Sequence, residues 1–114
     1  MRHDELYIRD MVEAAAAIET FLVGVTREAF LDSDLLRSAV LHKLTIIGEA
    51  ASRISREFAN RFPEVEWAAI SGFRNIAVHE YFAVDWKIVW VGATKEAPIL
   101  GAQINEILKK EFPE

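Results

Sequence analysis

Cysteine is absent from this chain, and proline and glycine are scarce, with three and five among 114 residues. Without cysteine there are no disulfides and no thiolate metal ligands, which favours a reducing compartment. No apolar run approaches the ~20 residues that a membrane-spanning helix needs. Charges interrupt the first segment, MRHDELYIRDMVEAAAAIETFLVG, so it is typical of neither a signal peptide nor an anchor. We therefore expect a soluble, cytoplasmic protein that has no contact with a membrane.

Basic residues are also few. Thirteen Lys and Arg face 18 Asp and Glu, for a net charge of −5. This balance argues against a broad basic surface for nucleic acid, but it does not exclude an enzyme that handles one phosphate in a local pocket. There is no glycine-rich phosphate loop, and no spacing of acids or histidines predicts a zinc, calcium or magnesium site. Apolar residues make up 52% of the chain, so we expect an oligomer interface to cover part of them.

Helical periodicity runs through nearly the whole chain, which predicts one domain over residues 1–114. The apolar residues from Ile8 to Leu22 recur every three or four residues, which predicts a helix over 4–25 that ends near Gly24. Ser33 is a good N-cap, and a long second helix is predicted from there to about Asn60, before Pro63 breaks the chain.

Three further helices are predicted over 66–81, 85–95 and from Pro98 to about Phe112, with Asp85 as a cap. WKIVWVG, residues 86–92, has β-propensity, but a single strand would have no partner, so a helix is preferred. The predicted class is all-α, an up-and-down bundle of four main helices plus a short C-terminal helix.

One stretch, FRNIAVHEYF at 73–82, gathers polar groups among apolar neighbours. In a regular helix, Tyr81 would fall about 20° from Arg74, on the same stripe. His79 would fall about 140° from Arg74 and share a face with Asn75. Arg74 and His79 would not touch within one helix, so two copies related by a two-fold axis are the simple way to bring them into one cleft.

This set of groups suits RNA cleavage. A histidine near its unperturbed pKa transfers protons at neutral pH, and an arginine can hold a phosphate and stabilise its growing charge. The 2′-hydroxyl of RNA supplies the nucleophile, so no metal and no protein nucleophile is required. Asn75 would position a phosphate oxygen or the imidazole, and Tyr81 would hydrogen-bond the substrate.

Structural interpretations compete with this one. An arginine and a histidine on one helix are more often surface residues or part of a bundle seam. Gly48 inside a helix indicates close approach of another helix. We expect Glu49 to be buried against a positive partner such as an arginine, with a role near the site as the less favoured view. We expect His3 to be solvated and His42 and Lys43 to lie on a polar edge of the bundle. The three tryptophans are expected to be anchors in the core or at an interface: Trp67, Trp86 and Trp90.

Residues 74–81, RNIAVHEY, fit the R-x-x-x-x-H-x-Y motif of HepT-like toxins, which are members of the HEPN superfamily. Three more segments resemble the same family, and together they cover most of the chain from about Leu41 to Leu108. Phe73 and Ala97 depart from the common residues without removing a functional group. The matching segments are IIGEAASRIS at 46–55, FPEVEWAAISGFRN at 62–75 and YFAVDWKIVW at 81–90.

The resemblance implies a HEPN-like helical bundle that forms a homodimer, with the motif lining a cleft at the interface. It implies a metal-independent endoribonuclease in which Arg74 and His79 are catalytic and Asn75 and Tyr81 assist. The partner antitoxin, a minimal nucleotidyltransferase, would attach AMP to Tyr81 within a type VII toxin–antitoxin pair. ATP and Mg²⁺ would belong to that antitoxin, so no cofactor is expected for this chain.

Two other functions stay open from the sequence. The chain could be a non-catalytic HEPN module that binds a nucleotide or presents a surface to a nucleotidyltransferase. It could also be a purely structural bundle that dimerises, although that would not explain why Arg74, Asn75, His79 and Tyr81 occur together.

Glu80 adds a negative charge beside His79, which would disfavour a bound polyanion and raise the histidine pKa.

Overall fold

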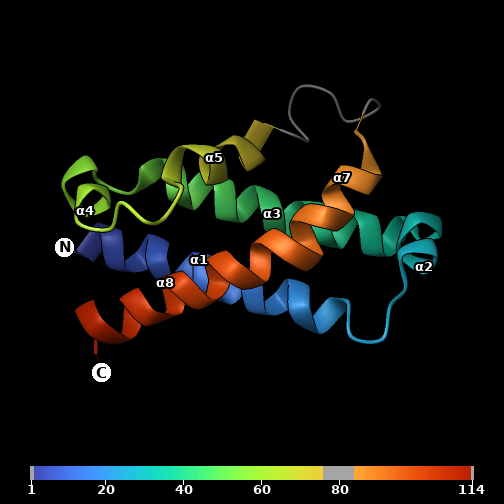
Figure 1. The fold of residues 1–114 in the computed structure, drawn as a ribbon, viewed down its shortest axis with the longest axis horizontal. Helices are drawn as coiled ribbons and strands as arrows, with labels where there is room; N and C mark the ends of the chain where they lie inside the picture. Colours follow the sequence, from blue (N-terminus) through green and yellow to red (C-terminus); the bar gives the residue numbers. More distant parts are fainter. Residues whose placement is uncertain (1, 76–83, 114) are drawn as a thin grey trace.

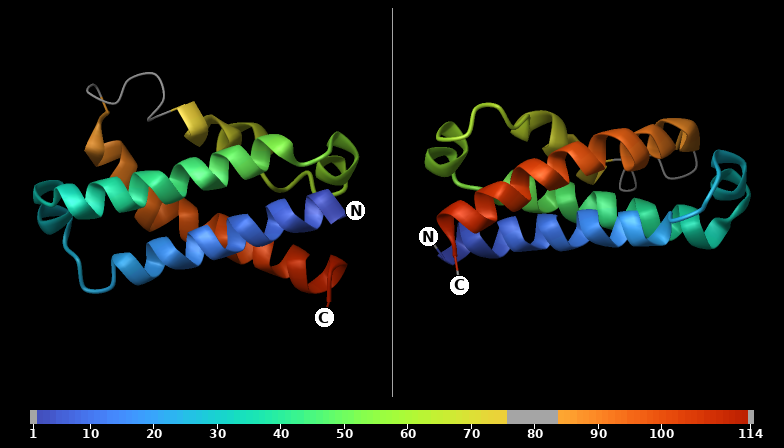
Figure 2. Two further views of the ribbon diagram at one scale, coloured as in Figure 1. Left: turned by 180° about the vertical axis from the view of Figure 1, so that it is seen from behind. Right: turned by 60° about the horizontal axis from the view of Figure 1, so that its bottom comes forward.

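Three long helices form the body of the protein in a computed structural model that describes residues 2–75 and 84–113 (Figure 1). They are α1 (Arg2–Phe21), α3 (Asp34–Arg53) and α8 (Ala97–Glu111). Helix α1 packs against both α3 and α8, and the two turned views show α8 crossing the other two (Figure 2). The molecule measures 41 × 29 × 21 Å.

The core lies where the apolar stripes of these three helices meet. Ile8, Met11 and Ile18 of α1 are fully or almost fully buried, as their helical spacing predicts. The residues that meet them from α3 and α8 include Val40, Leu44, Ile47, Leu100 and Ile104.

A short helix that the sequence did not predict lies between α1 and α3. Helix α1 ends at Phe21, and Gly24 has a positive φ of 72°, which suits glycine because it has no Cβ. The Thr26 hydroxyl oxygen then accepts a hydrogen bond from the Ala29 amide at 3.1 Å and caps the short helix α2 (Arg27–Asp32).

The long second helix is two helices, so that prediction was wrong. Ser33 caps α3 as expected, with its hydroxyl oxygen 3.0 Å from the Leu36 amide, but α3 ends at Arg53. Ser55 then caps a short α4 (Arg56–Asn60), and both its amide and its hydroxyl donate to the carboxylate of Asp4, each at 2.8 Å. Asp4 is 2% exposed and lies 51 residues away in sequence, so the apolar pattern of the helix gave no sign of this break.

The predicted third helix is confirmed only at its start. Helix α5 (Trp67–Ser71) is followed by the 3₁₀ segment η1 (Gly72–Arg74), so the regular α-helical angles used above do not hold there. The predicted remainder, up to Tyr81, lies outside the described residues.

The predicted fourth and fifth helices form one continuous run. Asp85 caps α7 (Trp86–Val91) by accepting from the Lys87 amide at 3.0 Å, so WKIVWVG is helical as expected. The π-helical segment η3 (Gly92–Glu96) leads directly into α8. Pro98 lies in the first turn of α8 and has no amide to donate to Thr94, so the local bonding is rearranged without a break.

The all-α HEPN-like bundle class is confirmed, and no strand occurs over residues 2–75 and 84–113. The C-terminal helix has nearly the predicted bounds, but with 15 residues α8 ranks with the main helices instead of being the short one. None of the described helices is long and apolar enough to cross a membrane.

Substituting Asp4 tests the α3–α4 break. Asp4→Ala leaves two donors of Ser55 unpaired in a partly buried place, so the free energy of unfolding is expected to fall by about 1.5–3 kcal/mol. Urea unfolding followed by circular dichroism measures this change. Asp10→Ala, at an exposed position of the same helix, is the control. Equal stability of the two variants would contradict the assignment.

Candidate functional site

Arg74 and Asn75 are exposed to solvent at the end of η1, and they are the last described residues before 76–83. Neither side chain is part of the packed core. His79 and Tyr81 lie outside the described residues, so the convergence of Arg74 and His79 stays a prediction.

The backbone at Arg74 is held against α3 by Gly48. A Cβ built on Gly48 would lie 2.9 Å from Phe73 Cβ and 3.0 Å from the Phe73 carbonyl carbon, and closer still to the Arg74 amide nitrogen. Real Cβ atoms do not approach other atoms this closely, so only glycine permits the contact. The close approach predicted at Gly48 is confirmed, and its partner is the backbone that carries Arg74.

Glu49 differs from the expectation in one respect. Its predicted arginine partner is present, because Arg53 Nη2 lies 2.9 Å from Glu49 Oε2, but the Glu49 side chain is 46% exposed rather than buried. A residue next to Gly48 points about 100° away around the helix, toward solvent. The hydrogen bond and the charge of Glu49, followed by Tyr7, raise the pKa of Arg53.

On the C-terminal side of residues 76–83, Val84 and Trp86 pack against the core. Trp86 packs against Phe30 in an edge arrangement, with ring centroids 6.5 Å apart. The guanidinium carbon of Arg37 lies 5.3 Å from the Trp86 ring centroid, and Arg37 Nη1 donates to the Leu31 carbonyl at 2.9 Å. Positions 37 and 48 of α3 therefore hold the two ends of this part of the chain, about 16 Å apart along the helix axis.

The other candidates have structural roles. His3 and His42 are exposed, and Lys43 is half-buried on α3. The three tryptophans are partly buried against the core, as expected for anchors, and Trp67 also donates its indole N–H to the Phe62 carbonyl at 3.1 Å. In the described ranges, no three His, Cys, Asp or Glu side chains gather as they would around a metal ion.

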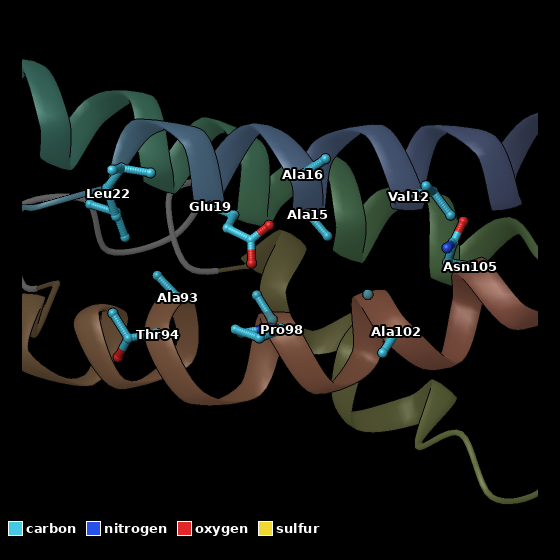
Figure 3. A pocket seen from close by; sticks show the side chains of 13 residues that line it. Val12, Ala15, Ala16, Glu19, Leu22, Ala93, Thr94, Pro98, Ala102 and Asn105 are labelled. Atoms are coloured by element: carbon cyan, nitrogen blue, oxygen red, sulfur yellow. The ribbon is translucent and has the colours of Figure 1, made fainter.

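A groove beside α1 is not suited to a phosphate. It is a groove of about 720 Å³ between α1 and the η3–α8 run (Figure 3). Small side chains such as Ala15, Ala93 and Ala102 line it, and Glu19 is its one ionisable lining residue. A lone carboxylate repels a phosphate, and none of the predicted site residues takes part.

A second groove of about 390 Å³ lies beside the candidate site, and we call it the acidic groove. It begins at Phe73, the neighbour of Arg74. The sequence gives no sign of this groove, because its carboxylates come from two segments about thirty residues apart and no motif spacing links those segments. The lining residues are Glu64, Glu66, Ala69, Ile70, Phe73, Glu96, Ile99, Leu100 and Gln103.

Comparison with known families agrees with the resemblance seen in the sequence. Residues 11–107 match the model of the family described as "Ribonuclease HepT-like". The chain belongs to the HepT-like ribonuclease family. The expected family and the expected enzyme class, an endoribonuclease, are thereby confirmed.

Relatives of this HepT-like chain match it over nearly their full length. "Putative RNase TTE0752" of Caldanaerobacter subterraneus subsp. tengcongensis is 33% identical over 97% of this chain and 99% of its own. "Probable ribonuclease HepT" of Thermococcus cleftensis is 32% identical over 90% of this chain and 94% of its own. "Putative RNase MJ1380" of Methanocaldococcus jannaschii is 30% identical over 91% of this chain and 95% of its own. No solved structure matches the chain.

Two glycine substitutions test the anchoring of Arg74. Gly48→Ala is expected to destabilise the protein by about 1–3 kcal/mol, because its methyl group would collide with the backbone of η1. Gly72→Ala is the matched control, since a Cβ there meets nothing within 4 Å and its φ is −62°. That change is expected to be neutral or stabilising by up to about 1 kcal/mol. Thermal and urea unfolding would disprove the anchoring if both variants behaved alike.

Proposed function

We propose that this HepT-like protein is the toxin of a toxin–antitoxin pair and cleaves RNA without a metal ion, using Arg74 and His79. The proposal rests on the position of Arg74 in a chain that belongs to a ribonuclease family. Its side chain is exposed, while its backbone is fixed against α3 at Gly48. The fixed backbone sets the point from which the guanidinium can reach a phosphate and bind it. The names of the three relatives, each an RNase or ribonuclease, support the same substrate class.

The reaction follows from the two groups. The imidazole of His79 removes the proton of the 2′-hydroxyl, and the resulting oxyanion attacks the adjacent phosphorus. Arg74 donates to the non-bridging oxygens and stabilises the charge that builds up on them. The 5′-oxygen leaves and takes up a proton, which gives a 2′,3′-cyclic phosphate and a 5′-hydroxyl end. Asn75, exposed beside Arg74, supports the phosphate or the imidazole.

A homodimer completes the site in this proposal. On a regular helix Arg74 and His79 would lie about 140° apart. A second copy would bring an arginine and a histidine into one cleft on any local geometry that keeps Arg74 at the edge of the bundle. The 3₁₀ turn at η1 changes the local angles, but it keeps Arg74 exposed at the edge of the bundle.

Neutralisation would act through Tyr81. A minimal nucleotidyltransferase partner, which supplies its own ATP and Mg²⁺, would attach AMP to the phenolic oxygen. The added phosphate would pair with Arg74 and occupy the place of the substrate. This chain would then need no cofactor of its own.

One observation favours a second candidate, a non-catalytic module that binds a partner. The acidic groove places Glu64, Glu66 and Glu96 around a hollow that borders Phe73. Carboxylates in that position repel an RNA backbone and suit a protein partner. A module of this kind would bind its partner but leave RNA intact.

Cleavage of RNA by purified protein separates the two candidates. Arg74→Ala is expected to lower the cleavage rate about 10²–10³-fold, and His79→Ala about 10²–10⁴-fold. Wild-type activity should persist in EDTA because no metal takes part. Arg56→Ala, an exposed arginine on α4, is the control and should keep full activity. If wild type and Arg74→Ala give the same RNA products at the same rate, the nuclease proposal is wrong.

Adenylylation of Tyr81 gives a separate test of neutralisation. Unmodified and adenylylated proteins are incubated with total cellular RNA, and only the unmodified form is expected to cleave it. Tyr81→Phe cannot accept AMP, so it should stay toxic in cells that also express the antitoxin. Equal cleavage by the two forms would count against the proposed regulation and leave the nuclease activity standing.

A further inference from the structure

The acidic groove combines an apolar floor with unpaired negative charge. Ile70 and Leu100 are buried beneath it, while Ile99 is 65% exposed at its edge. Glu64, Glu66 and Glu96 are exposed and form no ion pair with any residue of 2–75 or 84–113. Such a surface suits an apolar side chain that is flanked by positive charges.

Helix α7 of the same protein presents a surface of that kind. Ile88 is 68% exposed and Val91, one turn later, is 44% exposed. Lys87 of α7 and Lys95 of the following η3 segment are exposed before and after them in sequence, and neither lysine pairs with an acid in the described part of the chain. We call Lys87, Ile88, Val91 and Lys95 the α7 face.

We propose that the α7 face of one copy docks into the acidic groove of a second copy, and that the reverse contact forms at the same time. This inference rests on the homodimer in the proposed function and names the surfaces that build it. Each copy carries both halves of the contact, so a two-fold axis satisfies both at once.

Chain connectivity supports this arrangement. The acidic groove is lined by residues 64–73, before residues 76–83, and by residues 96–103 after them, and the α7 face lies between these two parts in sequence. Figure 1 shows α5 and α7 on the same side of the molecule, joined by that part of the chain. Arg74 directly follows Phe73 of the acidic groove, so in the proposed dimer the Arg74 of each copy would lie beside one of the two reciprocal contacts.

The energetics favour a second copy over RNA as the occupant. Three carboxylates repel a phosphate backbone, whereas the two lysines of the α7 face carry the opposite charge and attract them. Burial of Ile88, Val91 and Ile99 removes apolar surface from water, which supplies most of the affinity. The charges set the register and the partner.

Reversal of charge on both sides of the contact tests the docking. Sedimentation equilibrium of the full-length protein gives the dimer dissociation constant. Lys87→Glu and Glu66→Lys are each expected to raise it at least about tenfold, because attraction becomes repulsion. The double variant should recover most of the loss. Ile88→Asp should give monomers even at high protein concentration.

Exposed positions elsewhere provide matched controls. Lys109→Glu and Glu57→Lys change the net charge by the same amounts on α8 and α4, and they should leave the dissociation constant unchanged. Unfolding curves check that each variant is folded. A dimer insensitive to Lys87→Glu, Glu66→Lys and Ile88→Asp would overturn the docking, as would a wild-type protein that stays monomeric.

RNA cleavage by the wild-type protein is measured in parallel, so that the two proposals can fail separately. A dimer that responds as expected but does not cleave RNA refutes the nuclease and keeps the docking. Cleavage by a dimer that ignores the substitutions refutes the docking and keeps the nuclease.

Discussion

The contact between Gly48 of α3 and the backbone of Phe73 and Arg74 is the constraint on which the site depends. Because Gly48 has no side chain, the backbone of η1 packs directly against α3, closer than any Cβ would allow. Because α3 is rigid and packs against α1 over much of its length, the position of Arg74 is set by the core. An exposed, positively charged side chain is thus carried on an immobile support.

The same helix also holds the other end of the candidate site. Arg37 lies over Trp86 and bonds to the Leu31 carbonyl, so α2, α3 and α7 are connected at one point. Residues 76–83 connect two attachment points on one helix, and the bundle fixes the distance between those points.

Charge is distributed unevenly for a protein that belongs to a ribonuclease family. The net charge is −5, and three glutamates surround the groove next to Arg74. Such a surface suits a narrow contact with RNA around one phosphate and a broader contact with protein. The proposed dimer resolves this, because lysines of a second copy would cover the carboxylates.

The sequence by itself determined the helical class, the caps at Ser33 and Asp85, the core face of α1, the close approach at Gly48 and the family. These features depend on periodicity, capping chemistry and motif spacing, which are local along the chain. Tertiary structure decided the break at Ser55, which donates hydrogen bonds to the buried carboxylate of Asp4. It also decided which backbone packs against Gly48, namely that of Phe73 and Arg74. It also gathered Glu64, Glu66 and Glu96 at one groove and joined α7 to α8 through η3. Contacts between residues distant in sequence leave no periodic trace, so only the folded chain could show them.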